Sequence, residues 1–171
     1  LDVFVANGGL QPNVALLSGG SATYAQRAQL FENDGAGAYG EVADAAPGTS
    51  VGRGAAFADY DDDGDVDVYV ANSAQRGRLL RNDAPAAGGW LRVELIGQGA
   101  NTAGIGARVV VDVGGRLQVR EARSGSSYAS SSDPRLLFGL GAATRVDRVA
   151  VRWPDGSVQW APGAKANGAI R

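Results

Sequence analysis

Short runs of apolar and β-branched residues recur along the chain, and Gly, Asn, Asp or Pro residues separate them. Runs of this length and composition are typical of β-strands. In the first half of the chain they predict strands at residues 2–6, 29–32, 52–60, 67–71 and 78–81. No segment has the apolar spacing of an amphipathic helix of about ten or more residues. The pattern therefore predicts an all-β protein.

The second half of the chain shows the same kind of pattern. Its apolar runs predict strands at residues 90–97, 135–141, 145–153 and 157–160. A further run, residues 107–122, contains Gly114-Gly115, a two-residue hairpin turn signal, and so predicts two antiparallel strands. Together these strands predict a C-terminal, antiparallel β-sandwich-like domain.

An internal repeat organises the first half of the chain. The segment "LDVFVANGG" (1–9) returns as "VDVYVANSA" (66–74), and "QRAQLFENDG" (26–35) returns as "QRGRLLRNDA" (75–84). Each copy has the order strand, "VAN", linker, strand, and its tight, glycine-rich strands suit a propeller blade. Two copies predict about two blades, which is a partial β-propeller.

The repeat ends at "APAAGG" (84–89), the segment that best fits a linker. We therefore expect two domains. Residues 1–86 would hold the repeats, and residues 89–171 would form the β-sandwich-like domain.

The segment "DYDDDGDVD" (59–67) holds six aspartates in nine positions. Its alternating aspartates, with Gly64 at position six, fit the start of a calcium loop of the EF-hand type. In such a loop alternate side chains point inward, the glycine permits the sharp turn, and the residue after it offers its backbone carbonyl. The predicted Ca²⁺ ligands are the aspartates at alternate positions: Asp59, Asp61, Asp63, Asp65 and Asp67.

This loop differs from an EF-hand in two respects. Val70 stands where the bidentate Glu of an EF-hand belongs, and the flanking segments read as strands rather than helices. Two other interpretations stay open. One is a solvated acidic turn without a metal, and the other is a magnesium site, which is disfavoured because Mg²⁺ prefers fewer protein ligands and retained water.

Composition narrows the possible chemistry. The chain has 171 residues and a net charge of −2, and it contains neither histidine nor cysteine. Ser-His-Asp and Cys-His catalysis and zinc-thiolate sites are therefore excluded. No basic tract indicates nucleic-acid binding, and no apolar run approaches the roughly 18 residues of a membrane span.

An enzymatic interpretation would use the carboxylates of residues 59–67 as acid and base, as in glycoside hydrolysis. Aspartates that chelate a cation are held ionised, which makes them poor proton donors. We therefore expect a protein without enzymatic activity.

Two further groups of residues are candidates for ligand binding. The hydroxyl-rich segment "RSGSSYASSSD" (123–133) could bind a sugar or an anion. Trp90, Trp153 and Trp160 could form a carbohydrate platform. The more common alternatives are a serine-rich strand edge for the first group and core or cross-strand packing for the second.

The segment "GRGAAFADYDDDGDVDVYVAN" (52–72) resembles an FG-GAP/VCBS repeat, the calcium-loop blade of propellers like those of integrin α-chains. The resemblance implies a Ca²⁺ ion bound between two strands, and residues 59–67 match the family pattern at each acidic position and at its glycine. Asp2 corresponds to Asp67, the last ligand of the loop. The rest of an earlier loop is absent, so no site is expected at Asp2.

Three segments of the second half resemble the ASPIC/UnbV domain: "GIGARVVV" (104–111), "REARSGSSYASSSDPRLLFGLG" (120–141) and "VDRVAVRWPDGSVQ" (146–159). This domain follows such repeats in cartilage acidic protein-like and bacterial secreted proteins. The two resemblances together imply a calcium-binding, non-enzymatic, extracellular or cell-surface module for adhesion or for binding a protein or carbohydrate ligand. The alternative is an accessory part of a secreted carbohydrate-active or biosynthetic enzyme.

Overall fold

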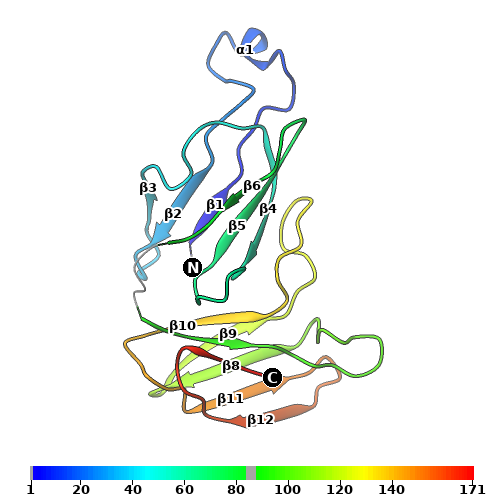
Figure 1. The fold of residues 1–171 in the computed structure, drawn as a ribbon. Coiled ribbons are helices and arrows are strands. Elements are labelled where there is room, and N and C mark those ends of the chain that lie inside the picture. The colour runs from blue at the N-terminus through cyan, green and yellow to red at the C-terminus, as the bar shows by residue number, and fades with distance from the viewer. Residues whose placement is uncertain (1, 84–87) are drawn as a thin grey trace. The chain divides into compact units, whose positions relative to one another are not determined.

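The computed structural model describes residues 2–83 and 88–171, and Figure 1 shows their strands. These residues form two compact units. The first comprises the residues up to Phe57 with residues 67–82 and 127–131, and the second comprises residues 58–66, 83–126 and 132–171. Both units are built from β-sheets, which confirms the all-β prediction. Helix α1 (Val14–Leu17) has four residues, and no described helix is long and apolar enough to cross a membrane.

Two three-stranded sheets make up the first unit. One has the order β1-β2-β3, with the bounds Val3–Val5, Gln29–Asn33 and Tyr39–Val42. The other has the order β4-β5-β6, with the bounds Gly52–Ala58, Asp67–Asn72 and Arg78–Leu80. A propeller blade typically has four strands, so the partial propeller stays a prediction.

Strand pairing reproduces the internal repeat. Val3 pairs with Phe31 in the first sheet, and their counterparts in the repeat, Val68 and Leu80, pair in the second. The next two residue pairs of each sheet continue in the same register. Because a register is set by which residues face the same side, two copies with one hydrophobic pattern adopt one pairing. The predicted repeat is therefore confirmed.

The asparagine of "VAN" makes the same hydrogen bond in both copies of the repeat. Asn7 Nδ2 donates to the carbonyl oxygen of Arg27 at 3.0 Å, and Asn72 Nδ2 donates to that of Arg76 at 2.8 Å. Each bond ties the end of one strand to the start of the next part of the repeat. This shared contact gives the recurring asparagine of "VAN" the same structural role in both copies.

The second unit also contains two sheets. One has the order β10-β7-β13, with the bounds Leu136–Gly141, Gly89–Val93 and Gly168–Ile170. The other has the order β12-β11-β8-β9, with the bounds Val158–Pro162, Arg148–Arg152, Arg108–Val113 and Arg116–Glu121. The predicted hairpin turn at Gly114-Gly115 joins β8 to β9, and both glycines have positive φ.

One hydrophobic core is shared by the two sheets of the second unit. Leu91 and Phe138 contribute to it from one sheet, and Val109 and Val149 contribute from the other. Burying a side chain of this kind contributes about 1.5–3 kcal/mol. A core between two sheets is the arrangement of a β-sandwich. Among the described strand pairs of this unit, β13 and β7 run parallel, whereas the others run antiparallel.

The expected domain boundary between residues 86 and 89 stays a prediction. Residues 84–87 of the expected linker lie outside the described residues.

Candidate metal centre

The acidic loop runs from the end of β4 to the start of β5, as predicted. Two residues in it have positive φ: Asp62 at 62° and Gly64 at 95°. A Cβ atom at Gly64 would lie 2.0 Å from Nε1 of Trp90. At this distance the two atoms would clash, and the indole ring would have to shift. Gly64 is therefore required twice, once for its backbone conformation and once for the close approach of the indole ring.

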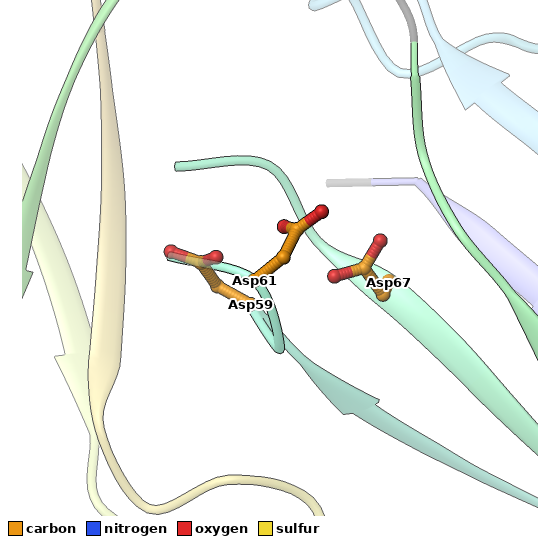
Figure 2. Close-up of side chains that lie close together, drawn as sticks. All are labelled: Asp59, Asp61 and Asp67. Atoms are coloured by element: carbon orange, nitrogen blue, oxygen red, sulfur yellow. The ribbon is translucent and has the colours of Figure 1, made fainter. Parts of the chain in front are cut away.

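Three of the predicted ligands come together in this loop. Asp59, Asp61 and Asp67 each offer one carboxylate oxygen, and these oxygens lie within 4.8 Å of one another. Figure 2 shows the three side chains close together, with Asp59 and Asp61 on the loop and Asp67 at the start of β5. Two oxygens on opposite sides of a calcium ion, each at about 2.3–2.6 Å from it, are about 4.6–5.2 Å apart. The three carboxylates are thus spaced as ligands of one cation could be.

The carboxylate of Asp59 is the most unusual member of the cluster. Asp59 is 4% exposed, and its Oδ1 atom has no hydrogen-bond partner. Almost all buried polar atoms in native proteins have a partner, because leaving one without a partner costs about 1–3 kcal/mol or more. A cation held among the three carboxylates would provide that missing partner.

The other oxygen of Asp59 is held by two donors. Asp59 Oδ2 accepts a hydrogen bond from the backbone N–H of Gly64 at 3.2 Å, and it lies 3.3 Å from the guanidinium of Arg92. Arg92 also forms an ion pair with Asp62. These contacts fix the orientation of the Asp59 carboxylate, so that only Oδ1 is left without a partner.

Asp67 is also anchored by the backbone. Asp67 is 2% exposed, and its Oδ1 accepts a hydrogen bond from the backbone N–H of Asn82 at 2.8 Å. Asp2, its counterpart in the repeat, accepts the same bond from Asn33 at 2.9 Å. The strand-end aspartate therefore has a structural role in both copies, and in one copy it also belongs to the carboxylate cluster.

The remaining aspartates of the loop lie outside the cluster. Asp63 is exposed, and its Oδ1 accepts a hydrogen bond from the backbone N–H of Asp65 at 2.9 Å, which shapes the turn. Its carboxylate is not among the grouped oxygens, and neither is that of Asp65, whose expected contribution was its backbone carbonyl. The assignment of Asp63 and Asp65 as metal ligands stays a prediction.

Two arginines lie near the loop, and no local sequence pattern predicts that they do. Arg92 lies on β7, far along the chain from Asp59, and its guanidinium lies 5.9 Å from the ring centre of Trp90. Arg135 lies 3.5 Å from Asp62 and also donates a 3.4 Å hydrogen bond to the carbonyl oxygen of Asp59. A hydrogen bond with Asp133 raises the pKa of Arg135, and the charges of Asp62 and Asp59 add to this effect.

These arginines offset part of the repulsion among the six aspartates of the loop. Asp62 and Asp59 are partly neutralised by cations from the second unit, of which residues 58–66 are part. The three grouped carboxylates offer oxygen ligands within 4.8 Å of one another, which is the kind of ligand that a divalent cation such as Ca²⁺ prefers.

The three tryptophans do not form a common platform. Trp90 lies against Gly64 of the loop, and Trp153 packs on the core of the second unit. Trp160 is 63% exposed on β12. In the hydroxyl-rich segment, Tyr128 is exposed, and the backbone of Tyr128 and Ala129 packs against Gly54 of β4.

Comparison with known families gives a match for the C-terminal part of the chain. Residues 97–171 match the family model described as ASPIC and UnbV. This confirms the resemblance of the second half of the chain to that family, with a match that begins at residue 97 rather than at 89. The resemblance of residues 52–72 to FG-GAP/VCBS repeats stays a prediction. A search of curated proteins finds no match to the chain.

Proposed function

We propose that this chain is a calcium-binding module without enzymatic activity, and that it serves binding or adhesion in a secreted or cell-surface protein. The observation that carries the calcium part is the buried Oδ1 of Asp59, which has no partner and belongs to a cluster of three carboxylates. A solvated acidic turn would not bury two of its three grouped aspartates.

Asp59, Asp61 and Asp67 would hold the ion. Calcium suits this set because it accepts six to eight oxygen ligands at flexible angles, and backbone carbonyls of the loop can complete the shell. The ion would supply positive charge and cross-links within the loop, which is a structural contribution. Asp63 and Asp65 would add to the site only if the loop tightens around the ion.

Two observations support the remaining parts of the proposal. The grouped carboxylates lack the histidine or cysteine partner that most nucleophilic and general-base sites use, because the chain contains neither residue. The ASPIC/UnbV match of residues 97–171 suggests a module of a secreted protein.

Thermal unfolding of the chain in Ca²⁺, in Mg²⁺ and in EDTA tests the calcium part. We expect Ca²⁺ to raise the melting temperature, because a ligand at 100 times its Kd stabilises by about 2.7 kcal/mol. Mg²⁺ should raise it less, because Mg²⁺ prefers fewer protein ligands and retained water. Asp61→Asn should remove the effect. Asp44→Asn is the matched control, since Asp44 is exposed at a φ of 56° that asparagine also tolerates. Equal melting temperatures of the unmodified chain in Ca²⁺ and in EDTA would refute the proposal.

A further inference from the structure

The outward face of the four-stranded sheet β12-β11-β8-β9 carries an apolar row that crosses all four strands. Trp160 pairs with Ala150, Ala150 with Val110, and Val110 with Val119. The residues next to these in each strand face the core instead, because side chains alternate between the two faces of a sheet. The row therefore lies on the side of the sheet that is turned away from the hydrophobic core.

Both ends of this row are exposed. Trp160 is 63% exposed and Val119 is 60% exposed. Ala150 and Val110 lie between them and have short side chains. They form a flat apolar surface, here called the shelf, beside the indole ring. An exposed tryptophan on an edge strand adds little to the core of its own domain, since its apolar surface remains in water.

Arginines flank the tryptophan on both sides. Ala150 pairs with Trp160, so Arg148 and Arg152, two residues away on β11, are its diagonal neighbours, about 7–8 Å off and within reach of a long side chain. The guanidinium of Arg148 lies 5.5 Å from the centre of the Trp160 ring and 3.1 Å from Asp112.

Arg152 is placed directly opposite Arg108 on the neighbouring strand. Like charges in this position destabilise a sheet. Arg108 lies 3.7 Å from Glu121, a loose contact, while no ion pair of Arg152 occurs among residues 2–83 and 88–171. An opposed arginine pair without a shared acid is costly to the fold, but an anion placed between the two guanidinium groups would be bound by both.

We propose that this face binds an acidic polysaccharide. The binding surface, here called the Trp160 face, consists of Trp160, Arg148, Arg152 and Arg108. The apolar face of a sugar ring would stack on the indole of Trp160, and a carboxylate or sulfate group of the same or the next sugar would pair with Arg152 and Arg108. The shelf of Ala150 and Val110 leaves room for the chain to continue across the sheet.

The charge distribution favours this ligand over an apolar protein surface. The acids on this face, Asp112 and Glu121, lie on β8 and β9, toward the far edge of the sheet from Trp160. Arg148 and Arg152 on β11 therefore lie beside the exposed Trp160 of β12, and Arg108 adds a third positive charge from the neighbouring strand β8. That combination matches a ligand whose units each present a flat apolar face and an anionic group.

This inference rests on the proposed role as a binding module, but not on calcium. Its test is a titration of the full chain with three probes: polygalacturonate, dextran sulfate and uncharged dextran, each in Ca²⁺ and in EDTA. We expect binding of one or both acidic polymers and none of dextran. The two acidic probes distinguish carboxylate from sulfate recognition. Binding that persists in EDTA would show that the Trp160 face acts independently of the metal centre.

Three variants make the test specific. Trp160→Ala should weaken binding about tenfold, which corresponds to about 1.4 kcal/mol, because the sugar ring loses its stacking partner. Arg152→Gln should weaken it about tenfold or more, as expected for a lost charge-assisted contact. Arg116→Gln is the control, because it removes the same charge from an exposed residue whose strand position points away from this face.

Several outcomes would overturn the proposal. One is binding of uncharged dextran as strong as that of the acidic polymers. Another is binding that Trp160→Ala and Arg152→Gln reduce no more than Arg116→Gln does, which would indicate attraction by charge alone. A third is self-association of the chain in sedimentation experiments that Trp160→Ala abolishes while no polymer binds, since the face would then pair with a second copy. Melting curves of each variant confirm that it is folded.

Discussion

The guanidinium of Arg92 lies 3.3 Å from Oδ2 of the buried carboxylate of Asp59. Arg92 thus compensates one oxygen of Asp59 while the other oxygen remains without a partner in the carboxylate cluster. Removing one member of a buried ion pair leaves an uncompensated charge, which costs about 3–5 kcal/mol. The contact is therefore central to how the loop is held when no metal is bound.

Arg92→Gln should lower the free energy of unfolding by about 3–5 kcal/mol in EDTA. In Ca²⁺ the loss should be smaller, because the ion supplies part of the positive charge that the guanidinium provided. Urea unfolding in both conditions measures the two losses. Arg148→Gln is the control, since its pair with Asp112 is more exposed and should be worth only about 0–1 kcal/mol. An equal loss for Arg92→Gln in Ca²⁺ and in EDTA would contradict this account.

Gly64→Ala should destabilise the chain more than Gly37→Ala does. The two glycines have nearly the same φ, 95° and 99°, so both substitutions carry the strain of a left-handed conformation, about 1–2 kcal/mol. Only Gly64 has a neighbour in the way, because its Cβ would lie 2.0 Å from Nε1 of Trp90, whereas nothing lies within 4 Å at Gly37. Thermal melts of both variants measure the difference. Equal losses would mean that the indole moves away at little cost.

Asp34 should contribute more to the stability of the folded state at neutral pH than in acid. Hydrogen bonds from the backbone N–H groups of Ala36 and Ala38 lower the pKa of its carboxyl. A lowered folded-state pKa stabilises the protein above the unfolded value, about 3.9, and this contribution is lost as the pH falls through the folded value. The difference in stability between the unmodified chain and Asp34→Asn should therefore shrink below about pH 4. A difference that does not change with pH would contradict the assignment.

Much of the strand pattern was predictable from local sequence. The alternation of Val with aromatic residues predicts β1 and β5, and the paired glycines predict the β8–β9 turn. Two strands were missed: β3 (Tyr39–Val42) and β13 (Gly168–Ile170). Both are short and contain glycine, and β13 is defined by parallel pairing with β7, a contact between distant parts of the chain that leaves no local pattern.

The candidate site was predictable only as far as local spacing determines it. Alternate spacing places Asp59 and Asp61 on the same side of a turning loop, and Asp67 follows at the start of the next strand. The same spacing also predicted Asp63, but its carboxylate is engaged by the backbone of the turn. The role of Arg92 could not be predicted, because nothing in the local sequence indicates which distant cation will pair with a buried carboxylate.

Titration calorimetry with Ca²⁺ on Asp67→Asn and Asp2→Asn tests the central claim most directly. Both aspartates accept the same backbone hydrogen bond in their copies of the repeat, but only Asp67 belongs to the carboxylate cluster. We predict about one site per chain for the unmodified protein, the same heat for Asp2→Asn, and no heat for Asp67→Asn. Binding by Asp67→Asn that equals that of the unmodified chain, or no heat from the unmodified chain itself, would contradict the assignment of a calcium site to this loop.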